Sequence, residues 1–130
     1  SFSYRNVQLE TSVSEASPHQ LVSLLFEGLL QSLAAAKGAM LNANIPAKGS
    51  SIGRAVRILE EGLKAGLDTE RGGELAANLR SLYDFCIFRL TDANLRNDVA
   101  IVDEVIRLIQ PVADGWNEIR SDVAVQSSRA

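Results

Sequence analysis

The apolar residues of this chain recur at the spacing of amphipathic helices in four successive segments. In the first segment Leu21, Leu25, Leu29 and Leu33 repeat every four residues and predict one long helix. Asn, Pro, Gly or Asp residues, which favour turns, separate the segments. The predicted helices span residues 17–43, 48–67, 73–94 and 98–122.

Local signals mark where two of these helices begin. Ser17, followed three residues later by Gln20, forms a capping-box pattern at the start of the first helix. Asp98 is placed to cap the fourth helix. Pro111 lies inside the fourth helix, where a proline removes an amide donor, so the pattern predicts a kink between Arg107 and Pro111.

Four helices of about 20 residues joined by short turns favour antiparallel neighbours. The sequence therefore predicts an all-α fold, an antiparallel up-down four-helix bundle over residues 17–123. Residues 1–16 lack helical periodicity but carry apolar side chains, including Tyr4 and Val7, and we expect them to form an N-terminal strap packed on the bundle. Residues 124–130 are expected to be a flexible tail.

Composition and charge narrow the classes of function. The 130 residues are 46% hydrophobic and carry a net charge of -3, which argues against the broad basic surface of a nucleic-acid-binding protein. The single His and single Cys leave too few groups for most metal sites and for most nucleophile and base pairs. We expect no enzyme activity, no catalytic, cofactor-binding or metal site, no nucleic-acid partner and no membrane insertion, in a cytoplasmic protein.

Three polar or reactive side chains are candidates for a special role. His19 occupies the second position of the first helix, where we expect an exposed surface residue. Cys86 lies on the apolar stripe of the third helix and is expected to be a core residue. Arg89 lies near the same stripe, where an ion pair is commoner than an anion site. The partners left open for it are Asp68, Asp84, Asp103 and Glu104.

The helices carry more apolar residues than one core stripe requires. On the third helix Leu75, Leu79, Leu82 and Cys86 are taken as core-facing, and other apolar side chains lie to either side of them. Scattered surface positions or a wider core are one interpretation. A groove for an apolar peptide is the other. The predicted groove residues are Ile58, Tyr83, Phe85, Ile87, Phe88 and Ile106.

Several short motifs follow one another in a distinctive order and spacing. They are Tyr4 with Val7, residues 16–28 (ASPHQLVSLLFEG), 54–59 (RAVRIL), 82–85 (LYDF), 89–90, 93–94 and 97–98, and Trp116. In this order they resemble the FliS family of flagellar secretion chaperones, and the resemblance covers nearly the whole chain.

The resemblance implies a cytosolic export chaperone without a cofactor. Such a protein binds the C-terminal segment of flagellin, prevents its premature polymerisation and assists its delivery to the flagellar type III export apparatus, where it meets an export gate component. It also implies that Tyr4 and Val7 belong to a displaceable strap. A homodimer in the absence of client is a further expectation. The alternative function is that of a helical adaptor or homo-oligomeric scaffold that uses the same apolar face.

Overall fold

The computed structural model describes the backbone of residues 16–129 and the side chains as far as Ile119. Tyr4 and Val7 of the predicted strap lie outside the described residues. The described part of the chain is helical and contains no strand, so the all-α prediction is confirmed. Its elements are α2 (Pro18–Leu41), α3 (Ile45–Arg57), the π-helix η1 (Ile58–Lys64), α4 (Gly73–Arg96) and α5 (Val99–Arg129).

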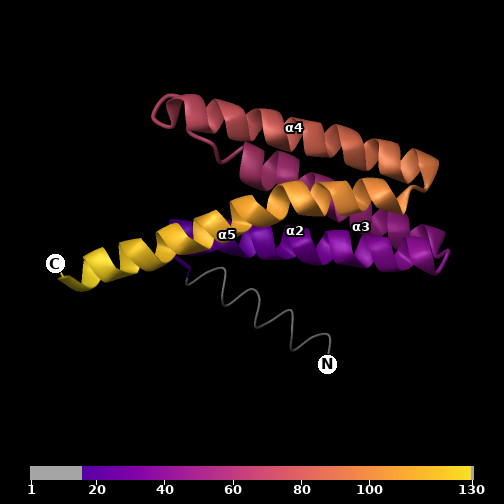
Figure 1. The fold of residues 1–130 in the computed structure, drawn as a ribbon, viewed down its shortest axis with the longest axis horizontal. Coiled ribbons are helices and arrows are strands. Elements are labelled where there is room, and N and C mark those ends of the chain that lie inside the picture. The colour runs from indigo at the N-terminus through magenta and orange to yellow at the C-terminus, as the bar shows by residue number, and fades with distance from the viewer. Residues whose placement is uncertain (1–15, 130) are drawn as a thin grey trace.

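The helices form the up-down bundle that the sequence predicts. Figure 1 shows α2 running to one end, α3 and η1 returning, α4 crossing above them and α5 returning between α4 and α2. The α2–α3 and α4–α5 turns therefore lie at the same end of the bundle. There the Lys48 Nζ atom donates a hydrogen bond of 3.1 Å to the Asn94 carbonyl oxygen and joins the two turns.

The helix boundaries have identifiable causes. The Ser17 hydroxyl accepts from the Gln20 amide and the Gln20 side chain accepts from the Ser17 amide, which confirms the capping box. The Asp98 carboxylate accepts from the Ala100 amide at 3.0 Å, which confirms the predicted cap of α5. Asn97, at a φ of 54°, adopts the left-handed conformation that ends α4.

Three boundaries differ from the sequence prediction. The second helix begins at Ile45, because Asn44 caps it by accepting from the Ala47 amide at 3.2 Å and Pro46 suits its first turn. The same helix changes to a π-helix at Ile58. The helix α5 continues to Arg129, so the backbone of the predicted flexible tail is helical through that residue.

The helix α5 passes through Pro111 without interruption. Its axis changes direction along its length in Figure 1, in keeping with the predicted kink. The half of α5 beyond Pro111 therefore leaves the axis of the first half and runs past the start of α2.

The core lies where all helices meet. Leu29 and Leu33 of α2, Leu59 of η1, Leu90 of α4 and Ile109 of α5 are fully buried there. On length and composition alone α2 would also suffice to cross a membrane, but its most deeply buried leucines pack against the other helices, as in the central helix of a bundle.

The core-facing side of α4 differs from the prediction. Leu75 is 68% exposed and Leu79 and Leu82 are only half-buried, whereas Tyr83 is 3% exposed. The stripe that is buried has the alternating three- and four-residue spacing of a bundle seam. It consists of Ala76, Tyr83, Cys86, Leu90 and Ala93. The helix is therefore rotated about its axis relative to the prediction, which leaves larger apolar side chains on its outer face.

Candidate functional site

A groove of about 450 Å³ separates α2 from the junction of α3 and η1. At the edge of this groove η1 approaches α2 closely at Gly62, where a Cβ atom would lie 2.9 Å from Cδ2 of Leu25. A Cβ atom on Gly28 would lie 3.5 Å from Cδ1 of Ile58, which is an ordinary van der Waals contact. The groove lining mixes apolar and charged side chains. It consists of Leu25, Arg54, Arg57, Ile58, Glu61 and Gly62.

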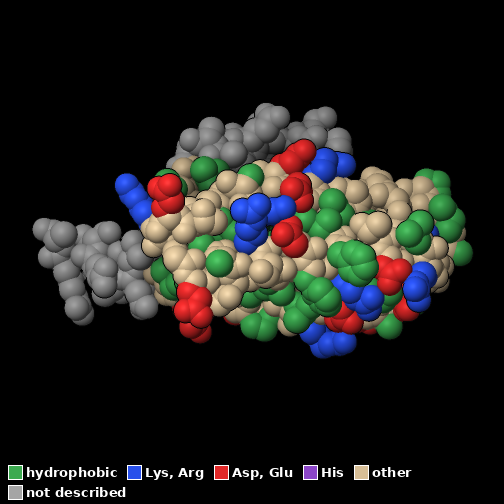
Figure 2. All heavy atoms as spheres, turned by 90° about the horizontal axis from the view of Figure 1, so that it is seen from above, with side chains coloured by type: hydrophobic (Ala, Val, Ile, Leu, Met, Phe, Trp, Pro, Cys, Tyr) green, Lys and Arg blue, Asp and Glu red, His purple; other side chains and the backbone are tan. Residues whose placement is uncertain are grey.

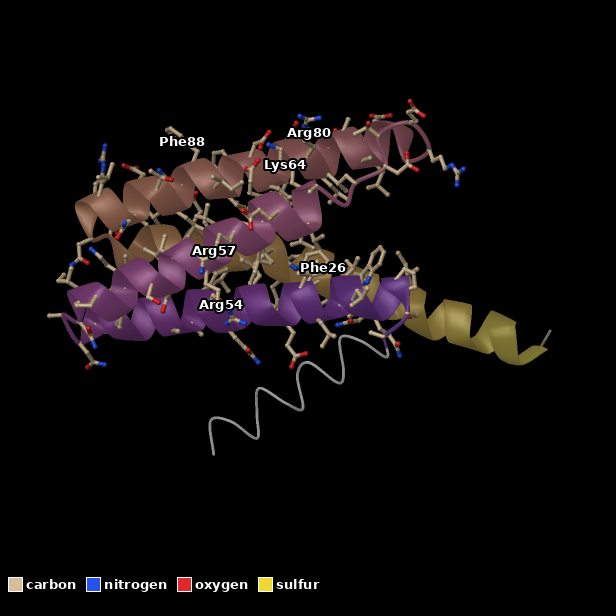
Figure 3. All side chains as sticks on the ribbon, turned by 180° about the vertical axis from the view of Figure 1, so that it is seen from behind. Phe26, Arg54, Arg57, Lys64, Arg80 and Phe88 are labelled. Carbon is tan, nitrogen blue, oxygen red and sulfur yellow. The ribbon has the colours of Figure 1, made fainter. Side chains whose placement is uncertain are left out.

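The basic edge of this groove is held by a buried serine. The Ser32 hydroxyl donates to the Gly28 carbonyl oxygen at 2.8 Å and accepts from Nη1 of Arg54 at 3.0 Å. Figure 3 shows Arg54 and Arg57 at the boundary of α2 and α3. The Arg54 side chain is thus fixed by α2 although it belongs to α3, and its charge lies beside the apolar Ile58.

A second groove, of about 580 Å³, lies between α2 and α5. Ala16, the first described residue, lines it, together with Leu24 and Leu30 of α2 and Ala113 of α5. Its remaining lining is mostly polar and consists of Gln20, Ser23, Glu27, Gln110, Asp114 and Asn117, besides the buried Phe26. This groove therefore lies next to the N-terminal end of the described residues.

One end of the α2–α5 contact is closed by an aromatic pair. The rings of His19 and Trp116 stack with centroids 4.2 Å apart, and the Trp116 Nε1 atom donates to the His19 carbonyl oxygen at 3.0 Å. The prediction of an exposed His19 is therefore wrong, because the bent α5 brings Trp116 over it. Within the described part of the chain both ring nitrogens of His19 are buried without a hydrogen-bond partner.

The outer face of α4 carries the large exposed aromatic side chains. Phe85 is 47% exposed and Phe88 is 67% exposed, and Leu75 and Leu95 near the two ends of α4 are more exposed still. Figure 3 shows Phe88 pointing away from the bundle. Figure 2 views the molecule from the α4 side and shows apolar side chains at the surface between charged ones. Here the surplus apolar residues remain open to solvent.

The six predicted groove residues are not brought into one groove. Ile58 lines the α2–α3 groove, and Phe85 and Phe88 lie on the outer face of α4. Ile87 and Ile106 are half-buried against the core. The prediction that Tyr83 lines a surface groove is wrong in this structure, because the rotation of α4 places its ring in the core.

Ion pairs fix α4 to its neighbours on both sides. Arg89 donates to both carboxylate oxygens of Glu104, with Nε to Oε1 at 2.9 Å and Nη2 to Oε2 at 3.3 Å. It also donates to Asp92 at 3.1 Å. These hydrogen bonds lower the pKa of Glu104 and raise that of Arg89. Of the partners left open for Arg89, Glu104 is the one that the structure shows.

On the other side of α4 the Lys64 Nζ atom lies 2.8 Å from the carboxylate of Asp84. Glu60, one turn before Lys64, lies 3.3 Å from the same ammonium group. Hydrogen bonds to Asp84 and Glu60 raise the pKa of Lys64. The orientation of α4 is therefore held in part by ion pairs to η1 and α5.

The reactive side chains of the core are shielded. Cys86 is fully buried, as predicted, and burial raises the pKa of its thiol to about 11. Burial likewise raises the pKa of Tyr83 to about 12. Among the described residues no group of His, Cys, Asp and Glu side chains has the arrangement of a metal site. Among the described residues, the candidate binding surfaces are therefore the outer face of α4 and the two grooves.

Sequence reasoning missed the contribution of a glycine and a serine. Gly62 lies within a helical pattern, and an isolated glycine in such a pattern is a signal for close packing. The Ser32 to Arg54 hydrogen bond had no such signal, because its donor and acceptor are brought together only by the packing of α3 on α2.

Comparison with known proteins identifies the family of this chain. The family model described as "Flagellar protein FliS" matches residues 1–123. The chain is 44% identical over 126 residues to the flagellar secretion chaperone FliS of Salmonella typhimurium, which covers 97% of this chain and 93% of that relative. It is 49% identical over 116 residues to the flagellar secretion chaperone FliSB of Pseudomonas aeruginosa, with 89% and 91% covered. A more distant relative, FliS of Bacillus subtilis, is 29% identical over 120 residues, with 92% and 84% covered. This chain therefore belongs to the FliS family of flagellar secretion chaperones.

Proposed function

We propose that this chaperone binds the C-terminal segment of flagellin in the cytoplasm, prevents its premature polymerisation and assists its delivery to the flagellar type III export apparatus. The observation that carries the proposal is the exposure of Phe85 and Phe88 on a helix already fixed by its neighbours. A chaperone of secretion requires an unfolded client, and exposed apolar side chains on a rigid helix offer such a client a surface to fold against.

The energetics favour a reversible complex. Full burial of a large apolar side chain contributes about 1.5–3 kcal/mol, and Phe85 and Phe88 are 47% and 67% exposed, so covering what remains exposed supplies about 2–3 kcal/mol. Ordering a disordered client costs about 2–5 kcal/mol or more, so the client also needs contacts outside these two residues. The expected affinity is therefore moderate, which suits a client that must be released at the export gate. The activity is stoichiometric and non-enzymatic.

The α2–α3 groove extends the proposed client surface. Ile58 and Leu25 supply apolar contacts there, and the guanidinium groups of Arg54 and Arg57 lie beside them. An apolar client segment with a carboxylate or a free backbone carbonyl suits this lining. We propose that the client passes over both α4 and this groove, with Ile87 as a half-buried contact between them and Ile106 as a contact on the α5 side.

The strap is proposed to act as a competitor of the client. Ala16 lines the α2–α5 groove, and the segment with Tyr4 and Val7 precedes Ala16 in the sequence. Apolar side chains of the strap are suited to cover part of the client surface until flagellin displaces them. Removal of residues 1–10 is expected to tighten client binding, and weaker binding would contradict a competing strap.

Calorimetric titration of the full chain with the C-terminal segment of the host flagellin tests the proposal. Phe88→Asp is expected to weaken binding at least tenfold without loss of helicity, because Phe88 is 67% exposed. Leu41→Asp is the matched control, since Leu41 is 68% exposed at the end of the bundle, away from the proposed surface. Absence of binding by the unaltered chain at tens of micromolar, or equal weakening by both variants, would contradict the proposal.

A helical adaptor or scaffold that pairs with itself is the second candidate function. It is favoured by the same exposed phenylalanines, which suit another copy of the chain as well as a client. Light scattering with and without flagellin separates the two functions. Oligomers that the client dissociates fit the chaperone with a homodimeric resting state, and oligomers indifferent to the client fit the scaffold.

A further inference from the structure

Two arginines of the α2–α3 groove carry charges that no carboxylate of the described residues neutralises. Arg54 and Arg57 both line the groove and lie one helical turn apart on the same face of α3. Neither is within ion-pair distance of a carboxylate among the described residues, whereas Lys64 and Arg89 each are. Of the described lining residues only Glu61 is acidic, so the lining keeps a net positive charge in a chain whose net charge is -3. The groove is therefore suited to an anionic group.

The guanidinium group of Arg54 is held in place within the chain itself. Its Nη1 atom donates to the Ser32 hydroxyl at 3.0 Å, and this hydroxyl is fixed in turn by donating to the Gly28 carbonyl oxygen at 2.8 Å. The Nη2 atom lies over Gly28, where a Cβ atom would be 3.4 Å away. The Ser32 hydroxyl accepts from Nη1 alone, so the other N–H groups of the planar guanidinium can still donate to a carboxylate. A cation fixed in this way loses little conformational freedom when it binds an anion.

Apolar side chains lie directly beside these charges. Leu25 of α2 and Ile58 of η1 line the same groove, and Gly62 contributes no side chain to it. Ile58 and Gly62 belong to the π-helix, an element that is frequent at functional sites. The volume of about 450 Å³ lies in the lower half of the range for small-ligand pockets, about 300–1,000 Å³. A groove of this size suits the end of a peptide better than a whole helix.

We propose that this groove receives the chain end of the client. The free α-carboxylate is held by Arg54 and Arg57, and an apolar side chain of the last few client residues packs against Leu25 and Ile58. This subsite rests on the proposed function, because the C-terminal segment of flagellin ends in such a carboxylate. Guanidinium groups bind carboxylates through charge-assisted hydrogen bonds that are often paired. An internal Asp or Glu fits less well, since a short groove would have to admit the client chain on both sides of it.

A carboxylate subsite gives the chaperone a means of recognising a completed chain. A flagellin chain still attached to the ribosome has its C-terminal carboxyl group in an ester bond to transfer RNA, which carries no carboxylate charge. Only the released chain offers the free carboxylate to Arg54 and Arg57. The subsite thus favours full-length flagellin over internal apolar segments and over unfinished chains.

Calorimetric titration of the full chain with two synthetic forms of the flagellin C-terminal segment, the free acid and the C-terminal amide, tests the subsite. The amide is expected to bind about tenfold more weakly than the acid, because it lacks the negative charge. Arg54→Gln and Arg57→Gln are each expected to weaken binding of the acid and to leave that of the amide nearly unchanged. The ratio of the two dissociation constants then falls to about threefold or less. In the unaltered chain this ratio is also expected to fall between about 0.05 and about 0.5 M salt, because both arginines are exposed.

Arg80→Gln is the matched control, since Arg80 is an exposed arginine of α4 outside the groove. Figure 3 shows Arg80 on a different helix from Arg54 and Arg57. This variant is expected to keep the ratio of about tenfold, and circular dichroism establishes that each variant keeps its helix content.

Three outcomes would overturn the subsite and leave the proposed function intact. They are equal binding of the acid and the amide, equal weakening of both forms by Arg54→Gln, and the same loss of the ratio in Arg80→Gln as in Arg54→Gln. If neither form binds the unaltered chain at tens of micromolar, the proposed function is contradicted and the subsite with it.

Discussion

The indole of Trp116 lies flat on the imidazole of His19, with an angle of 9° between the rings. Its Nε1–H group also donates to the carbonyl oxygen of the same histidine. One residue of α5, beyond Pro111, is thereby joined to the first turn of α2, which directly follows the proposed strap.

Replacement of this tryptophan tests the link. Trp116→Phe retains an aromatic ring but loses the donor, and we expect a loss of about 0.5–1.5 kcal/mol in the free energy of unfolding. Trp116→Ala also loses the ring, and we expect a loss of about 3 kcal/mol. Urea unfolding followed by circular dichroism measures both. Ile119→Ala, at a 50% exposed position of the same helix, is the control and is expected to change stability by less than about 0.5 kcal/mol.

Two glycine substitutions of the same kind are expected to have opposite effects. Gly38→Ala adds a Cβ atom where no other atom lies within 4 Å, so it is expected to stabilise α2 by about 0.5–1 kcal/mol. Gly62→Ala places a Cβ atom 2.9 Å from Leu25 and is expected to destabilise the fold by about 1 kcal/mol. Thermal unfolding of both variants is the measurement. If Gly62→Ala also stabilises the protein, the contact of η1 with α2 is looser than the structure indicates.

The double variant Leu25→Ala, Gly62→Ala should show a favourable coupling, because the smaller side chain relieves the clash.

The pairing of Arg89 with Glu104 predicts a loss of stability in acid. Hydrogen bonds from Arg89 hold the pKa of Glu104 below its ordinary value of 4.5, so the unfolded chain takes up this proton at a higher pH than the folded chain does. The ion pair therefore contributes fully to the free energy of unfolding above about pH 4.5. This contribution is lost as the pH falls through the lower pKa that Glu104 has in the folded chain.

Melting temperatures of the unaltered chain and of Glu104→Gln, measured between about pH 7 and about pH 3, test this. The variant is expected to melt at a lower temperature near neutral pH, and the gap is expected to close in acid. Glu60→Gln is the control, because Glu60 pairs with Lys64 within one helical turn at the surface and is expected to give a smaller gap. A gap for Glu104→Gln that does not change with pH would contradict the role of this ion pair.

The buried thiol of Cys86 predicts slow chemical modification and a loss of stability in alkali. Burial raises its pKa to about 11 from an ordinary value of 9.0, so the unfolded chain loses this proton first as the pH rises. Stability is therefore expected to fall between about pH 9 and about pH 11, and Cys86→Ala is expected to remove part of that slope. At pH 8 a thiol reagent should modify the folded chain at least a hundredfold more slowly than the chain unfolded in guanidinium. Equal rates would show that the thiol is accessible.

The sequence was sufficient for those parts of the fold that depend on neighbours along the chain. The capping box of Ser17 and Gln20 and the cap at Asp98 are local hydrogen bonds whose residue types and spacing identify them. The start of the second helix at Ile45 was missed although Asn44 and Pro46 mark it, because the same two residues also favour the end of the preceding helix.

The candidate surface was less predictable because it depends on how the helices are rotated against one another. Leu75 and Tyr83 exchange their expected environments, since apolar residues surround much of α4 and periodicity alone does not choose among them. The choice is made by contacts from other helices, such as the Arg89 to Glu104 and Lys64 to Asp84 ion pairs. Phe85 and Phe88 were correctly identified as surplus to the core, since no rotation of α4 buries every apolar side chain.

The π-helix between Ile58 and Lys64 has a consequence for the permissible length of the chain. A π-turn holds more residues than an α-turn, so this segment contains an additional residue compared with a continuous α-helix between the same end points. Deletion of one residue there would restore the ordinary ladder of hydrogen bonds, and the chain would still reach the turn before α4. The bundle can thus absorb a change of chain length inside a helix, where most folds accept insertions and deletions only in loops.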